Sequence, residues 1–139
     1  HGALYHLATN NRDIAEAIAR AVYAVDKELV LYGPFGSKLV EAGQKVGLVC
    51  AYEAFIDRTY QADGSLTPRS NPKALIESNE EAIRQALEIV QKGEVRAIHG
   101  ENIKLRADTL CIHGDGPHAL TFARQVKEAF EQAGIVIKH

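Results

Sequence analysis

The sequence lacks a long hydrophobic run, a strong net charge and any methionine. A helix that crosses a bilayer needs about 20 consecutive apolar residues, and no stretch of this chain approaches that length. The net charge is −2, and no run of basic residues interrupts the mixture of charges. The composition therefore excludes a membrane-spanning role and gives no electrostatic reason to expect nucleic acid as a partner.

The start of the chain also lacks familiar signals. It opens on His1 without a methionine, and neither the basic nor the apolar region of a signal peptide follows. We therefore expect a fragment or a processed chain of a longer, cytoplasmic protein. The two cysteines, Cys50 and Cys111, lie in apolar, strand-like runs, which favours buried thiols in a reducing compartment over a disulfide or a metal pair.

Short apolar runs alternate with stretches in which apolar residues repeat at the helical period. We predict helices at residues 12–25, 37–46, 78–92 and 117–133. We predict strands at 29–32, 48–52, 110–112 and 135–137, and a hairpin from 95–98 and 103–105. This order is typical of parallel strands that are buried on both faces and joined by helices, so the sequence predicts one α/β domain over residues 1–139.

In such folds the functional site forms beyond the carboxyl ends of the strands. The first candidate there is the turn that ends in Gly36 and Ser37, which enters a helix. Backbone N–H groups at a helix amino terminus can bind an anion. A tight strand-to-helix turn explains the same residues equally well.

The second candidate begins at Glu53, directly after a predicted strand, and includes Asp57 and Arg58. One interpretation is a salt bridge that holds the long connection from 53 to 76. The other is a site in which a carboxylate transfers a proton and Arg58 binds a substrate carboxylate through a bidentate contact. The residues alone leave both interpretations open.

The third candidate is His113-Gly114-Asp115, at the point where a strand turns toward a helix. A histidine paired with an aspartate can act as an oriented general base or as a metal ligand pair. The structural alternative is an aspartate helix cap beside a histidine bonded to the backbone. We favour the functional interpretation, because polar residues at this end of a strand have no role in a core.

Several blocks of the chain carry a family resemblance. They are His1-Gly2-Ala3-Leu4-Tyr5, Gly36-Ser37, Glu53-Ala54-Phe55-Ile56-Asp57-Arg58-Thr59-Tyr60, Leu66-Thr67-Pro68-Arg69 and Cys111-Ile112-His113-Gly114-Asp115. In this order they resemble the LamB/YcsF family over the whole chain. The resemblance implies an irregular (β/α) barrel of the glycoside hydrolase/deacetylase type. It also implies that this chain is the carboxy-terminal part of that barrel, whose front half is absent.

The resemblance further implies the A subunit of a 5-oxoprolinase, which opens 5-oxo-L-proline to L-glutamate with ATP and works with subunits B and C. On that basis Glu53, Asp57, His113 and Asp115 are the candidate catalytic residues. The candidate substrate-binding residues are His1, Gly36, Ser37, Arg58 and Tyr60, and no metal ligand is assigned. We expect these side chains to surround one cavity.

Two other functions fit the same residues. One is a metal-dependent hydrolase resembling deacetylases on the same type of barrel, and the other is a subunit that only binds a small anion. Half a barrel would also expose unpaired strand edges, which promote association. We therefore expect this chain to pair with its missing half, a second chain or another copy of itself.

Overall fold

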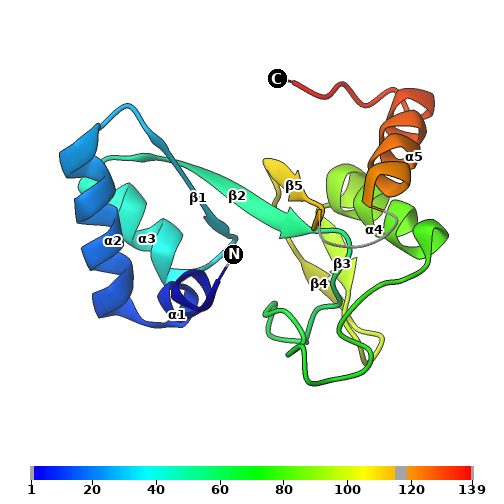
Figure 1. The fold of residues 1–139 in the computed structure, drawn as a ribbon, viewed down its shortest axis with the longest axis horizontal. Coiled ribbons are helices and arrows are strands. Elements are labelled where there is room, and N and C mark those ends of the chain that lie inside the picture. The colour runs from blue at the N-terminus through cyan, green and yellow to red at the C-terminus, as the bar shows by residue number, and fades with distance from the viewer. Residues whose placement is uncertain (1, 115–118, 139) are drawn as a thin grey trace. The chain divides into compact units, whose positions relative to one another are not determined.

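The computed structural model describes residues 2–114 and 119–138. Its elements follow the order α1 (Ala3–Asn10), α2 (Arg12–Val25), β1 (Val30–Pro34), α3 (Lys38–Val46), β2 (Val49–Phe55), α4 (Asn79–Lys92), β3 (Glu94–Arg96), β4 (Asn102–Lys104), β5 (Thr109–Cys111) and α5 (Ala119–Gln132) (Figure 1). Parallel strands alternate with helices in the first part of the chain, which confirms the predicted α/β class.

The described residues form two compact units. Unit 1 contains the chain up to Ala54 together with Ala107–Thr109, and unit 2 contains Phe55–Arg106 and the chain from Leu110 onward. β1, β2 and β5 form a three-stranded sheet in the order β1-β2-β5, and β3 and β4 form a separate two-stranded sheet. Among the described residues, no helix is both long and apolar enough to cross a membrane.

In unit 1, local sequence signals fix the helix ends. The side chain of Asn11 accepts a hydrogen bond from the Ile14 amide at the start of α2, and Ser37 does the same for the Val40 amide at the start of α3. α3 ends at Gly47, whose φ of 92° is a left-handed conformation that glycine adopts without strain. The structure also contains the helix α1, which the apolar periodicity of the sequence does not predict.

The core of unit 1 forms where these three helices meet β1. Its buried side chains are all alanine or leucine, and they are Ala8, Ala15, Ala19, Leu31, Leu39, Ala42 and Leu48. The alanines on the helices leave room for close packing, and the leucines fill the space between the elements. β1 pairs with β2 in parallel, from Val30 opposite Val49 to Pro34 opposite Glu53.

The prediction that the strands are buried on both faces is wrong for this pair. Val30 is 44% exposed, Tyr32 is 50% exposed and Val49 is 63% exposed, whereas Leu31 is buried. Side chains alternate between the faces of a strand, and the unit 1 core gathers on the face that carries Leu31. The opposite face of β1 and β2 is therefore apolar and accessible in this chain.

In unit 2, α4 packs against α5 and against β3. Ser78 caps α4 by accepting a hydrogen bond from the Glu81 amide, and Gly93 ends it, as predicted. The predicted hairpin is also present, with Glu94 opposite Lys104 in an antiparallel pair. The buried face of α5 consists of Phe122, Val126 and Phe130.

The predicted final strand at residues 135–137 is wrong. The structure assigns no regular element to these residues, and Val136 is 82% exposed. A run of β-branched residues has the local preference for a strand, but a strand is stabilised only when a neighbour supplies the backbone hydrogen bonds. Within the described part of the chain, no strand pairs with this segment.

Candidate functional site

Asp57 and His113 form a close pair in unit 2. Asp57 lies two residues beyond the end of β2, and His113 lies two residues beyond the end of β5. Asp57 Oδ2 accepts a hydrogen bond from the backbone N–H of His113 at 2.8 Å and lies 2.8 Å from His113 Nδ1. The Ile56 amide also donates to the Cys111 carbonyl at 3.3 Å, which brings the two segments together. The pairing of two sequence blocks 56 residues apart is the central feature of this site.

The surroundings of the pair restrict the orientation of the His113 imidazole and its contact with solvent. The side chains of His113 and Asp57 are 19% and 16% exposed, so both are largely shielded but still reach solvent. The ring of Phe55 stacks on the imidazole with 5.7 Å between the centroids. When Nδ1–H donates to the carboxylate, a neutral imidazole carries its acceptor lone pair on Nε2. This is the geometry of a histidine oriented by an aspartate to accept a proton.

The segment that carries Asp57 is held by hydrogen bonds on every backbone carbonyl from Phe55 to Tyr60. Gln85 donates to the carbonyls of Phe55, Ile56 and Arg58. Backbone amides donate to the remaining three carbonyls. The Ile76 amide donates to the carbonyl of Asp57, the Thr67 amide to that of Thr59 and the Ile98 amide to that of Tyr60. A buried turn with all its carbonyls satisfied has one favoured conformation, so the position of Asp57 is well defined.

The Arg58 side chain is buried and bonds to backbone carbonyls of the long connection. It is 3% exposed, and its guanidinium donates to the carbonyl of Ala74 at 3.2 Å and to that of Thr67 at 2.7 Å. Burial lowers the pKa of Arg58, and the nearby charge of Arg69 lowers it further, whereas Asp57 and Tyr60 act in the opposite direction. These contacts support the loop-holding interpretation, with backbone carbonyls as the partners in place of a carboxylate.

The side chain of Tyr60, which is predicted to bind substrate, is also buried and bonded to the backbone. Its side chain is 3% exposed, and its hydroxyl accepts a hydrogen bond from the Phe55 amide at 2.7 Å. Its backbone makes bridges with Leu66 and Ala97. These contacts tie the end of β2 to the long connection.

Glu53 forms a second close contact, in unit 1. It is 9% exposed, and the hydroxyl of Tyr5 on α1 donates to Glu53 Oε2 at 2.6 Å. Glu53 thus lies at the end of a strand as predicted, with a phenol holding one carboxylate oxygen. Sequence reasoning assigns no role to Tyr5, because the helix that carries it escapes the periodicity. The signal that could have found it was its place in the block His1-Gly2-Ala3-Leu4-Tyr5.

In the turn at Gly36 and Ser37, the polar groups of Ser37 bond to neighbouring backbone groups. The Ser37 hydroxyl accepts from the Val40 amide, and the Ser37 amide donates to the Pro34 carbonyl at 3.1 Å. Gly36 adopts a φ of 74°, which permits the sharp turn between β1 and α3. These contacts support the interpretation as a tight strand-to-helix turn, and they leave the Ser37 amide engaged where an anion would need it.

Two predicted site residues, His1 and Asp115, lie outside the described residues. Glu53 belongs to unit 1, whereas Asp57, Arg58 and His113 belong to unit 2. The expectation that all these side chains surround one cavity therefore stays a prediction. Across residues 2–114 and 119–138, no three histidine, cysteine, aspartate or glutamate side chains gather as a metal site would require.

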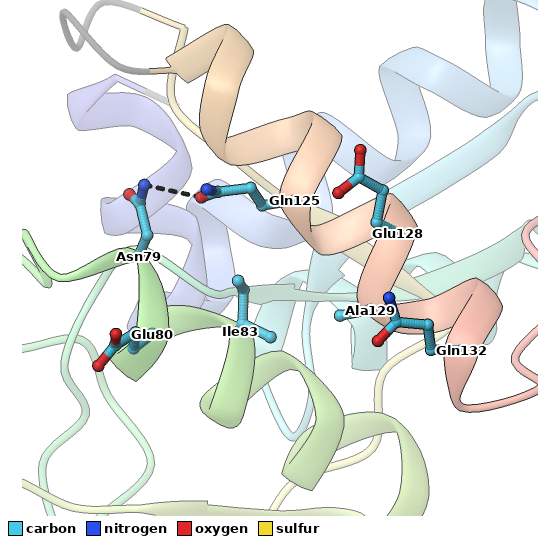
Figure 2. A pocket seen from close by; sticks show the side chains of 7 residues that line it. All are labelled: Asn79, Glu80, Ile83, Gln125, Glu128, Ala129 and Gln132. Atoms are coloured by element: carbon cyan, nitrogen blue, oxygen red, sulfur yellow. Dashed lines mark hydrogen bonds between the residues drawn. The ribbon is translucent and has the colours of Figure 1, made fainter.

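A hollow of about 420 Å³ lies between α4 and α5 in unit 2 (Figure 2). Its lining is mostly polar and includes Asn79 and Glu80 from α4 and Gln125 and Glu128 from α5. Asn79 Nδ2 donates to Gln125 Oε1 at 2.7 Å across it. The residues predicted for the functional site are not part of this lining, so the hollow is separate from the Asp57–His113 pair.

The sequence pattern of the LamB/YcsF family matches residues 1–139. The chain belongs to the LamB/YcsF family. Curated relatives include the A subunit of 5-oxoprolinase from Tolumonas auensis, which is 56% identical over 99% of this chain and 55% of its own length. The corresponding A subunit from Bacillus subtilis is 51% identical over 99% of this chain and 53% of its own. This LamB/YcsF chain thus spans about half the length of the curated relatives it matches.

A solved structure supports the same family relationship. The crystal structure of the Lactam Utilization Protein from Thermus thermophilus matches 99% of this chain and 55% of its own, with a TM-score of 0.91 and 46% identity. The predicted membership of the LamB/YcsF family is therefore confirmed, and the arrangement of strands and helices is consistent with part of a (β/α) barrel.

Proposed function

We propose that this LamB/YcsF chain is part of the A subunit of a 5-oxoprolinase and that its Asp57–His113 pair takes part in opening 5-oxo-L-proline to L-glutamate. The names of relatives at 49–56% identity support a role in 5-oxoprolinase, and the Thermus thermophilus protein is named for lactam utilisation. The observation that carries the proposal is the contact of 2.8 Å between Asp57 Oδ2 and His113 Nδ1.

Ring opening requires that water add to the lactam carbonyl and that the bond between that carbon and the ring nitrogen break. In our proposal His113 accepts a proton from the attacking water through Nε2, and Asp57 stabilises the imidazolium that forms. The oxygen of the water stays in the new carboxylate, and the departing nitrogen gains a proton to become the amine of glutamate. Phe55 keeps the imidazole plane in place during this transfer.

An unstrained amide is a poor electrophile, which is the chemical reason to expect coupling to ATP. At the Gly36–Ser37 turn the Ser37 amide donates to the Pro34 carbonyl and the Ser37 hydroxyl accepts from the Val40 amide, so the proposal gives neither group a nucleotide phosphate to bind. We therefore assign no step at this turn to ATP. Coupling to ATP and association with subunits B and C remain parts of the proposal that concern the whole enzyme.

The remaining candidates take different roles in the proposal. Asp57 orients His113, and Arg58 and Tyr60 hold the loop that carries Asp57. Glu53, held by Tyr5, is a second candidate for proton transfer and is to be tested by its own substitution. His1 and Asp115 stay candidates on the family resemblance alone.

The test uses the intact protein assembled with subunits B and C, with glutamate formation as the readout. We expect Asp57→Asn and His113→Gln each to lower kcat by roughly 10²–10⁴-fold, since an oriented general base typically contributes that much. Asp63→Asn is the matched control, because Asp63 lies in the same long connection, where Ser65 is its hydrogen-bond partner. Rates close to wild type in both site variants would refute the proposal. Altered substrate binding with unchanged turnover would indicate a binding subunit.

A further inference from the structure

The side chain of Gln85 is a buried polar group on an otherwise apolar helix face. It lies on α4 and is 8% exposed, and the other buried residues of that helix are Ala82, Ala86 and Ile89. The two alanines are completely buried and add little bulk on either side of it along the helix. A primary amide in such surroundings is costly unless its polar atoms are bonded, so its contacts explain its presence.

Those contacts all reach one short segment. Gln85 Nε2 lies 3.0 Å from the carbonyl oxygen of Phe55, 3.4 Å from that of Ile56 and 2.9 Å from that of Arg58. An amide nitrogen has two hydrogens, so the two short contacts are direct hydrogen bonds and the contact of 3.4 Å is shared. One side chain thus fixes peptide groups on both sides of Asp57.

The position of the Asp57 carboxylate depends on those peptide groups. Asp57 has a short side chain, so a rotation of its backbone moves the carboxylate oxygens by a similar distance. Its Oδ2 is 2.8 Å from both the backbone nitrogen and the Nδ1 of His113, and hydrogen bonds weaken steeply when such a geometry is disturbed. The turn around Asp57 must therefore keep its shape if both contacts are to persist.

We propose that Gln85 is a positioning residue that holds the turn at Asp57 and, through Asp57, the orientation and tautomer of His113. The inference rests on the proposed function of the Asp57–His113 pair, and it adds a residue on α4 that acts on the pair through backbone carbonyls. Its substitution is therefore expected to change how His113 is oriented and to leave the affinity for substrate largely unaltered.

The main test compares Gln85→Met with Gln125→Met in the intact protein. Methionine preserves length and removes the donors, and Gln125 is a matched control in unit 2 because its side-chain bond is to Asn79 on α4 and not to the turn. The readouts are kcat and KM for glutamate formation with subunits B and C, and the imidazole ¹⁵N shifts of His113. For Gln85→Met we expect kcat to fall about tenfold or more with KM little changed, and the Nδ1–H form of His113 to lose population. Gln125→Met should match wild type in all three.

Gln85→Glu provides a second variant of nearly the same shape, in which a carboxylate would face the three carbonyls. If either folded Gln85 variant keeps wild-type kcat and unaltered His113 shifts, the inference is overturned. If neither variant folds, hydrogen exchange in the wild-type protein decides. The side-chain N–H of Gln85 and Nδ1–H of His113 should then be protected together, and a freely exchanging Gln85 amide beside a protected His113 would overturn the inference.

The two proposals fail in different ways. If Asp57→Asn and His113→Gln retain full turnover, the proposed function is wrong, whatever Gln85 does. The His113 shifts in the Gln85 variants still decide whether Gln85 positions the pair, since that readout does not depend on activity.

Discussion

Asp57 and Arg58 are neighbours of opposite charge, yet their side chains have unlike partners. Asp57 reaches His113, whereas Arg58 turns into the protein and donates to the carbonyls of Ala74 and Thr67. A buried charge is tolerated when its hydrogen-bonding groups are satisfied, and a guanidinium carries five N–H donors that suit several carbonyls at once. The lowered pKa of Arg58 reflects the cost of that burial. Arg58 therefore holds the loop in one conformation, and that conformation places the Asp57 carboxylate beside His113.

Cys50 offers a pH-dependent test at the level of a single residue. Partial burial against the core of unit 1 raises the pKa of the Cys50 thiol, because the thiolate is the charged form and loses hydration there. Its Sγ also lies 3.7 Å from the Leu48 carbonyl, which suits the protonated thiol. In a Cys111→Ser background we expect alkylation of folded protein to need a higher pH than alkylation of protein unfolded in urea. Identical pH profiles for the two states would contradict the burial of this thiol.

The sequence places Asp57 and His113 beyond the ends of two strands, and the structure brings their side chains together. The catalytic and substrate-binding roles assigned to the site residues stay predictions. Asp57 and His113 each follow an apolar run that ends in a strand, so both could be placed beyond strand ends. Arg58 and Tyr60 have the chemistry of substrate-binding groups, and their contacts with backbone carbonyls and amides depend on how the long connection folds back. Gln85 escapes prediction because a helical pattern is recognised from its apolar residues alone.

At the scale of elements, α3 packs closely on β1 and β2 because it has a glycine, without a side chain, at the point of contact. Gly43 lies in the middle of α3 and is buried. A Cβ placed there would lie 2.7 Å from Cys50 Sγ and 2.7 Å from Leu31 Cδ2, which is closer than such atoms approach. Glycine normally weakens a helix by about 1 kcal/mol relative to alanine. Its use here indicates that close contact between the helix and the strands outweighs this cost.

Gly43→Ala is therefore expected to destabilise the protein, although alanine is the better helix former. We expect the free energy of unfolding to fall by about 1–3 kcal/mol, as is usual when a well-packed core must accept an extra group. Urea denaturation measures the change. Adding Cys50→Ala should restore part of the loss, because it removes one of the two close contacts. A more stable Gly43→Ala protein would show that α3 does not pack as described.

Helices were predicted more faithfully than strands, for a physical reason. The bounds of α2, α3 and α4 follow from local signals: the caps Asn11, Ser37 and Ser78, and the left-handed glycines that end α3 and α4. A strand depends on a neighbour that is distant in sequence, so the apolar run at 135–137 suggested a strand without supplying a partner. The sequence does not predict α1, because Ala8 is its only buried residue and the helix therefore has little apolar periodicity.

At the scale of the whole molecule, one apolar face of unit 1 needs an explanation. Val30, Tyr32 and Val49 share the exposed face of β1 and β2, and β1 is an edge strand of its sheet. Exposed apolar sheet edges promote association. The chain spans about half the length of its curated relatives. We expect the additional residues of those relatives to cover this face, as the barrel interpretation requires.

The 139-residue chain by itself should consequently associate through this face. We expect sedimentation equilibrium to show a concentration-dependent rise in mass, and Val30→Lys to weaken it, because a charged side chain on this apolar face opposes its burial against another chain. Leu120→Lys is the matched control, since Leu120 is 65% exposed but belongs to α5 in unit 2. If the wild-type chain stays monomeric at all concentrations, this face needs no partner, and the interpretation of the chain as an interrupted barrel loses its physical basis.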